Sequence, residues 1–178
     1  MGKVLDDFAA EARAILKRDS GKSGLDEVCK RLERVLLDKG FVAEHFGPGK
    51  DAPRRVIYED PELGFCILAH TYKGGTGSGP HDHGPAWAIY GQVEGVTTMT
   101  EYRLAARPEG GKPGKAAPVK SYDLTPGMAV AYGVGQLHSP ARAVETRLVR
   151  IEGMNLDRDT TGLWEHEKPT IPPGPNHN

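Results

Sequence analysis

The sequence predicts a mainly β domain, a sandwich or barrel of short strands, with a two-helix addition at its N-terminal end. Glycine (23) and proline (14) make up about a fifth of the 178 residues, nearly double their ordinary share. Short β-rich runs separated by turn residues recur after residue 40, as they do in all-β domains. Apolar residues at helical spacing precede them, which predicts the helical addition.

The first 40 residues carry two apolar stripes. The first runs from Val4 to Leu16 and the second from Leu25 to Leu36, and Gly40 is expected to end the second helix. We therefore expect two helices covering roughly residues 3–39. The predicted organisation is one domain: a helical segment over 1–40, a barrel over 41–165 and a C-terminal tail over 166–178.

The β-rich part divides into seven expected strands, each bounded by glycine or proline turns. They cover residues 55–58, 65–72, 86–92, 97–104, 128–132, 143–145 and 147–151. Residues 108–118 are polar and rich in glycine, proline and lysine, so we expect an exposed, mobile loop there.

Charge and cysteine usage narrow the function classes. The chain has 23 basic and 24 acidic residues and a net charge of −1, which argues against nucleic-acid and membrane-surface partners. Cys29 and Cys66 lie far apart, and a chain of this length needs no disulfide, so we expect reduced thiols and a cytoplasmic location.

The histidines predict a metal site. His81 and His83 follow a glycine-rich turn and are two residues apart, so on a strand both imidazoles point to one face. His138 ends another turn-flanked run, residues 132–138, which we expect to be a strand. Three neutral imidazoles can hold a divalent transition metal and leave one side of it open. The alternative is three unrelated surface histidines.

Two spaced motifs carry a family resemblance. The stretch Gly75-(x5)-His81-x-His83-(x4)-Ala88-(x6)-Gly95 resembles the first motif of the cupin superfamily, and Gly127-(x5)-Gly133-x-Gly135-(x2)-His138 resembles the second. The resemblance covers roughly residues 53–155. It implies a double-stranded β-helix barrel with a metal inside.

Departures from the cupin pattern indicate a subgroup. Most cupins have a metal-binding glutamate where this chain has Ala88, and proline and asparagine where it has Gly133 and Arg142. The remaining three-histidine set is similar to that of thiol dioxygenases such as cysteine dioxygenase and 3-mercaptopropionate dioxygenase. The resemblance implies mononuclear non-haem Fe(II), with O2 and a small thiol carboxylate as substrates and a sulfinate as product.

The surroundings of the expected metal differ from that family. Thiol dioxygenases carry Ser-x-His-x-Tyr on the strand after the last ligand, whereas this chain aligns Leu148-x-Arg150-x-Glu152 there. Ala88 and Glu152 also cannot form the cysteine–tyrosine crosslink of animal cysteine dioxygenases. Because such surrounding groups orient ligands and supply protons, we expect the substrate or even the chemistry to differ.

Several arginines are candidates for binding a substrate carboxylate, which a guanidinium grips through two parallel hydrogen bonds. Arg55 lies at a place comparable to the carboxylate-binding arginine of cysteine dioxygenase, and Arg54 takes that role if the register slips by one. Arg142 and Arg150 are the other candidates. Arg150 and Glu152 share a strand face; facing inward they form a charged wall near the metal, and facing outward an ordinary exposed pair.

Two further residues are candidates near the metal. Tyr90 is two residues beyond Ala88 and is expected to share its inward face, as a substrate-binding hydroxyl or as a core aromatic. His70 is either a hydrogen-bond donor beside the ligands or a structural histidine. His45, His166 and His177 are expected in solvated loops or the tail.

Two alternatives to the thiol dioxygenase remain open. One is an Fe(II)-dependent cupin dioxygenase that cleaves carbon–carbon bonds, and the other is a metal-binding or sensing cupin without turnover. The metal is also open, because three imidazoles suit Zn, Ni, Mn or Cu as well as iron. Pairing of strand edges favours a homodimer.

Overall fold

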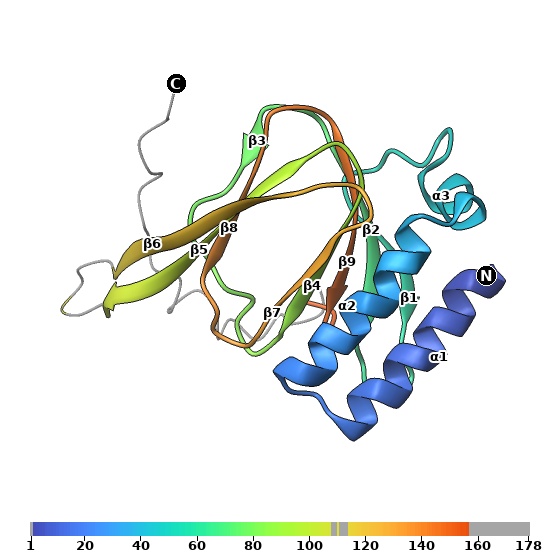
Figure 1. Ribbon diagram of the computed structural model, residues 1–178, viewed down its shortest axis with the longest axis horizontal. Coiled ribbons are helices and arrows are strands. Elements are labelled where there is room, and N and C mark those ends of the chain that lie inside the picture. The colour runs from blue at the N-terminus through green and yellow to red at the C-terminus, as the bar shows by residue number, and fades with distance from the viewer. Residues whose placement is uncertain (1, 108–109, 111–113, 157–178) are drawn as a thin grey trace.

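Three N-terminal helices and two antiparallel sheets form the computed structural model, which describes residues 2–107, 110 and 114–156 (Figure 1). The helices are α1 (Lys3–Arg18), α2 (Lys22–Leu36) and α3 (Lys39–Phe46). The strands are β1 (Arg55–Glu59), β2 (Cys66–Tyr72), β3 (Thr76–Gly77), β4 (Ala88–Glu94), β5 (Thr97–Ala106), β6 (Lys115–Leu124), β7 (Ala129–Tyr132), β8 (His138–Arg142) and β9 (Thr146–Glu152).

The two sheets make the predicted double-stranded β-helix barrel. One sheet has the strand order β1-β2-β9-β4-β7 and the other β3-β8-β5-β6. Strands that are distant in the sequence, such as β4 and β9, are hydrogen-bonded neighbours. The chain therefore crosses repeatedly from one sheet to the other. Helices α1 and α2 lie side by side against the five-stranded sheet, while the β5–β6 hairpin extends away from them (Figure 1).

The predicted apolar stripes of the first two helices are buried against the sheet. Leu5, Phe8 and Ile15 of α1 and Val28 and Leu32 of α2 are each at most 4% exposed. They join one core with the outward residues of the five-stranded sheet. None of the helices in the described part of the chain is both long and apolar enough to cross a membrane.

A third helix forms where the sequence analysis predicted an end to helical structure. Asp38 caps α3, its carboxylate accepting a hydrogen bond from the backbone N–H of Phe41 at 2.8 Å. Gly40 therefore lies inside a helix rather than ending one. Phe41, His45 and Phe46 are buried, so the prediction of a solvated His45 was wrong; apolar burial outweighs the weak helix propensity of glycine.

Three strand assignments also differ from the sequence analysis. Residues 143–145 form the turn between β8 and β9, and residues 133–137 form a turn that places His138 at the start of β8. Residues 115–118, expected in a mobile loop, begin β6 and pair with β5. The expected tail over 166–178, with His166 and His177, lies outside the described residues.

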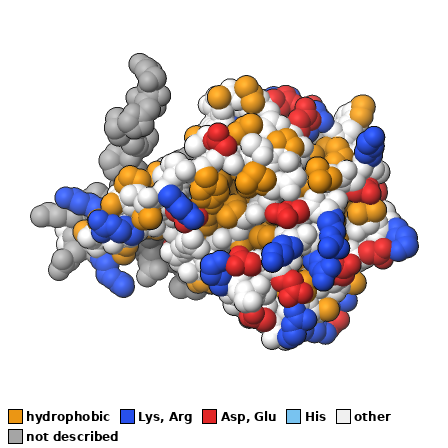
Figure 2. Space-filling view, in the orientation of Figure 1, with side chains coloured by type: hydrophobic (Ala, Val, Ile, Leu, Met, Phe, Trp, Pro, Cys, Tyr) orange, Lys and Arg blue, Asp and Glu red, His pale blue; other side chains and the backbone are white. Residues whose placement is uncertain are grey.

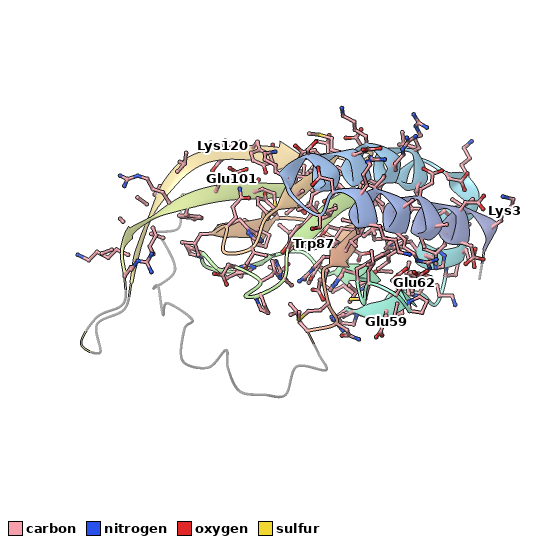
Figure 3. All side chains as sticks on the ribbon, turned by 90° about the horizontal axis from the view of Figure 1, so that it is seen from below. Lys3, Glu59, Glu62, Trp87, Glu101 and Lys120 are labelled. Carbon is pink, nitrogen blue, oxygen red and sulfur yellow. The ribbon has the colours of Figure 1, made fainter. Side chains whose placement is uncertain are left out.

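Register makes the two faces of the five-stranded sheet chemically different. On β9, Arg150 lies opposite Leu68 of β2 and Tyr90 of β4. Alternate residues such as Ile89 and Ile151 belong to the core shared with the helices. Trp87 packs against that same core, where the barrel meets the helices (Figure 3). The interior of the barrel holds the polar residues of these strands together with a second, smaller apolar cluster that includes Met99, Leu124 and Leu148.

Candidate metal centre

Three histidines from two separate segments meet at one end of the barrel interior. His81 and His138 form an isolated antiparallel bridge, each donating its backbone N–H to the carbonyl of the other at 3.0 and 2.9 Å. His83 follows two residues after His81. The nearest ligand atoms of the three imidazoles all lie within 4.8 Å of one another, a spacing suited to one shared metal ion.

Backbone carbonyls orient two of these imidazoles. Nδ1 of His138 donates to the carbonyl of Gln136 at 3.0 Å, and Nδ1 of His81 donates to the carbonyl of Gly79 at 2.9 Å. In a neutral imidazole this tautomer leaves Nε2 unprotonated, as the nitrogen that can bind a metal. Carbonyl partners of this kind fix the tautomer and ring orientation of metal-binding histidines.

The donor atoms fit a divalent transition metal. Nε2 of His83 and Nε2 of His138 lie 3.2 Å apart, so two basic nitrogens face each other. Burial lowers the pKa of His83 to about 2 and that of His138 to about 3, which keeps both rings neutral at pH 7. Neutral, convergent imidazole nitrogens are what Fe(II), Zn or Ni requires from a protein.

Tyr90 directs its hydroxyl between two of the ligands. Its oxygen lies 2.9 Å from Nε2 of His83 and 3.2 Å from Nε2 of His138. Burial raises the pKa of Tyr90 to about 12. The side chain faces inward as predicted, and its hydroxyl is the fourth polar group converging on the site.

Sequence reasoning missed an aromatic support for His138. The ring of Tyr132 stacks on the His138 imidazole, with centroids 3.9 Å apart and planes at 7°. The Tyr132 hydroxyl is 2.6 Å from that of Tyr122, which donates to Glu101 at 3.1 Å. The available signal was that Tyr132 ends a predicted strand, but only pairing with Ala88 shows that it faces inward.

Ala88 and Glu152 stand side by side on the inner face. They are cross-strand partners on β4 and β9, and both are buried. Ala88 offers no ligand atom at the position of the usual cupin glutamate. Glu152 instead faces two arginines, accepting from Arg150 at 3.1 Å and from Arg54 at 3.3 Å, and does not belong to the histidine cluster that could hold a metal.

Arg150 is fixed inside the barrel, which answers the open question of its direction. Besides Glu152, it donates to the hydroxyl of Tyr72 at 3.1 Å, and its guanidinium lies 5.3 Å from the centre of the Tyr90 ring. Tyr72 in turn bonds Nδ1 of His70 at 2.9 Å. His70 is therefore a buried member of this network, and burial lowers its pKa to about 2.

The structure does not place Arg55 in the site. Arg55 pairs with Ala69, an outward residue of β2, and its guanidinium donates to the backbone carbonyls of His45 and Lys50 beside α3. The assignment of Arg55 as a carboxylate-binding residue was wrong because alternation along β1 directs it toward the helix. The neighbouring Arg54 reaches Glu152 instead.

A cavity of about 170 Å³ opens beside His81. Its lining comprises Tyr72, Thr76, Gly77, Ser78, His81, Tyr90, Pro140, Arg142 and Arg150. A larger hollow of about 620 Å³ lies outside the barrel, between α2 and β7. Of the two, only the smaller one brings a predicted metal ligand and two arginines together, so it is the candidate substrate site.

On the face shown in Figure 2, acidic and basic side chains are interspersed.

Comparisons with known proteins give structural neighbours only. No family model and no curated protein matches this chain. A cupin-2 domain protein from Shewanella frigidimarina is 14% identical, with 66% of this chain and 95% of that chain covered and a TM-score of 0.44. KdgF from Halomonas sp. is 18% identical, with 58% and 81% covered and a TM-score of 0.43.

A further neighbour is named as an enzyme. The DMSP lyase DddQ from Ruegeria pomeroyi is 16% identical, with 54% of this chain and 41% of that chain covered and a TM-score of 0.40. Likeness at this level carries no information about what the present chain binds. Its chemistry has to be argued from its own residues.

Proposed function

We propose that this protein is a mononuclear non-haem Fe(II) dioxygenase that oxidises a small thiol carboxylate to a sulfinate. The overall reaction is R–SH + O2 → R–SO2H, in which sulfur is oxidised, both oxygen atoms enter the product and no further reductant is consumed. The observation that carries the proposal is the set of three convergent imidazoles beside a small cavity containing two arginines.

His81, His83 and His138 are the residues that would hold the iron. Bound iron supplies a redox-active centre for O2 and a positive charge that lowers the pKa of a substrate thiol. Because Ala88 replaces the usual carboxylate, the three ligands are all neutral and leave that charge uncompensated. An anionic thiolate is the kind of substrate group that such a site favours.

Tyr90 and the arginines provide the remaining functions. The Tyr90 hydroxyl, 2.9 Å from Nε2 of His83, holds a proton at its oxygen and can donate a hydrogen bond to a group bound beside the ligands. The positive charges of Arg142 and Arg150 line the cavity and favour a substrate that carries a carboxylate. With about 170 Å³, the cavity is smaller than the roughly 300–1,000 Å³ of sites for drug-sized molecules, which favours small thiols over aromatic ketones.

Oxygen uptake tests this proposal directly. Protein loaded anaerobically with Fe(II) is mixed with cysteine, 3-mercaptopropionate or cysteamine, and in separate arms with a diketone or a hydroxyacetophenone. We expect O2 consumption with a carboxylate-bearing thiol, and incorporation of both atoms of labelled dioxygen into a sulfinate detected by mass spectrometry.

Two variants control the experiment. His81→Ala removes a ligand and is expected to abolish uptake, whereas Val134→Ala, an exposed turn residue ahead of His138, is expected to leave it unchanged. Uptake with a ketone alone would replace the proposal by carbon–carbon bond cleavage. Tight metal binding without uptake in any arm would replace it by a binding or sensing role.

A further inference from the structure

The buried charges around the cavity do not balance. Glu152 is 2% exposed and accepts from both Arg150 and Arg54, at 3.1 and 3.3 Å. One carboxylate is thus shared by two guanidinium groups. Arg142 is a third arginine in this region, and within the described residues no carboxylate lies at ion-pairing distance from it. The cavity wall therefore carries an excess of positive charge.

Arg142 is buried and has no charged partner in the described part of the chain. Only 6% of the residue is exposed, and its Nε has no hydrogen-bond partner there. Its guanidinium lies over the ring of Tyr72, 4.0 Å from the ring centre. Burial lowers the pKa of Arg142. Taking a guanidinium out of water in this way is costly unless an anion compensates it.

A second unsatisfied polar group faces the same cavity. Thr76 of β3 is the direct cross-strand partner of Arg142 on β8, and directly opposed side chains lie on the same face of a sheet. The hydroxyl of Thr76 is buried and has no hydrogen-bond partner among the residues that the structure describes. Both residues line the cavity that also contains His81, so a ligand held by them extends toward the metal-binding imidazoles.

Arg150 differs from Arg142 in its surroundings. Its guanidinium is held by Glu152 and by the Tyr72 hydroxyl, and Glu152 compensates its charge. Arg150 therefore fixes the position of Tyr72, against which Arg142 stacks. The Nε atoms of both arginines lack a hydrogen-bond partner among the described residues, but only Arg142 also lacks a carboxylate at ion-pairing distance there.

We propose that Arg142 and Thr76 form the binding site for a carboxylate group of a small monoanionic ligand, with Arg150 as a positioning residue. This inference rests on the proposed function only for the identity of the substrate, because binding of the anion needs neither metal nor turnover. The guanidinium is positively charged and has only donors, so it binds a carboxylate, which is charged and accepts at two oxygens, better than a neutral amide. The threonine hydroxyl can donate a further hydrogen bond to the same carboxylate.

Binding of propionate to the metal-free protein tests the site. Propionate, propionamide and inorganic phosphate are titrated by NMR into wild type, Arg142→Gln, Thr76→Val and Arg147→Gln. Arg147 is the matched control, since it lies on β9 and donates to the carbonyl of Phe46 beside α3. We expect propionate to bind wild type and Arg147→Gln alike, and Arg142→Gln to bind it about tenfold or more weakly. Thr76→Val is expected to have a smaller effect in the same direction.

Thermal unfolding separates binding from a structural role. A buried arginine without a partner costs stability, so ligand-free Arg142→Gln is expected to unfold at a temperature no lower than wild type. Propionate is expected to raise the unfolding temperature of wild type more than that of Arg142→Gln. A large loss of stability in ligand-free Arg142→Gln would show a structural arginine and overturn the inference.

The remaining outcomes distinguish this inference from the proposed function. Equal binding of propionate and propionamide, or unchanged propionate binding by Arg142→Gln, would overturn the carboxylate site. Tighter binding of phosphate than of propionate would overturn the assignment to a carboxylate. Specific propionate binding together with no thiol-dependent O2 uptake would leave this site standing and reject only the dioxygenase.

Discussion

The two faces of the five-stranded sheet are made from alternating residues of the same strands, yet the outward face is apolar, whereas the inward face combines apolar residues with buried polar and charged ones. The outward face carries Ile67, Ile89 and Ile151, which pack against α1 and α2 in one apolar core. The inward face carries Tyr90 and Arg150, which are linked to the histidine cluster and to the charges around Glu152.

Residues that are adjacent in the sequence therefore have different roles: one packs in the apolar core, and the next lies in the candidate site. Ile89 and Tyr90 are consecutive, and both are buried, at 0% and 1% exposure. The first contributes apolar burial and the second a hydroxyl at the metal centre. If the two faces are as separate as their contacts indicate, substitutions on one should leave the property of the other unchanged.

The largest expected effect is on the inward face. His138→Ala removes one of three ligands and leaves a two-imidazole set, so we expect metal affinity to fall by more than the roughly 10–100-fold caused by losing a group that only supports a ligand. Metal content after dialysis and competition with a chelator measure the change. Ile89→Ala provides the comparison, since a similar loss of metal there would show that the two faces are coupled.

The next effect is on the outward face. Ile89→Ala is expected to lower the free energy of unfolding by about 2–5 kcal/mol, because it leaves a cavity in a fully buried core between sheet and helices. Urea unfolding of the metal-free protein measures this directly, and metal stoichiometry is expected to stay at the wild-type value. A destabilisation below about 1 kcal/mol would mean that the helices contribute little to the barrel.

The smallest effect is a dependence of the folding stability on pH, which we expect from His70 in the network around Arg150. The pKa of His70 is lowered to about 2, by burial first and by Arg150 second, whereas in the unfolded chain it is near 6.5. The unfolded state therefore binds a proton that the folded state does not, and stability is complete above pH 6.5 and lost as pH falls toward 2. The slope is at most about 1.4 kcal/mol per pH unit.

His70→Phe tests this dependence. The ring of His70 is stacked on Tyr72 with planes at 9°, and phenylalanine keeps a ring there but does not titrate. Urea unfolding at pH 7 and pH 5 is expected to show a smaller loss of stability on acidification than in wild type. An identical loss in the two proteins would place the acid sensitivity on other buried histidines.

Much of the fold was predictable because it follows local periodicity. The apolar stripes of α1 and α2 and the runs that became β2, β4 and β9 are visible as spacing in the chain. The third helix was missed because its burial of Phe46 depends on the sheet beneath it. Strand β6 was missed because its residues alternate weakly, and it is stabilised by pairing with β5.

The candidate site, like the fold, could be predicted only in part from the sequence. His81, His83 and His138 were predictable because their types and glycine-flanked spacing mark metal ligands, and the structure brings them within 4.8 Å. The sequence could not show which of the candidate arginines face the barrel interior, because a shift of one residue in register exchanges the two faces of a strand. Arg55 therefore looked suitable in the sequence and lies on the helix side in the structure.

The sequence by itself determined the fold class, several strands of the barrel and the three histidines of the candidate metal centre, because these depend on periodicity and residue type. Only the tertiary structure decided which charges are compensated, because an ion pair depends on which distant strands are neighbours. Glu152 lies at ion-pairing distance from Arg54, whereas Arg142 lies opposite Thr76 and, in the part of the chain that the structure describes, has no carboxylate beside it. That pairing, and not composition, is why we propose Arg142 as the residue that binds an anion.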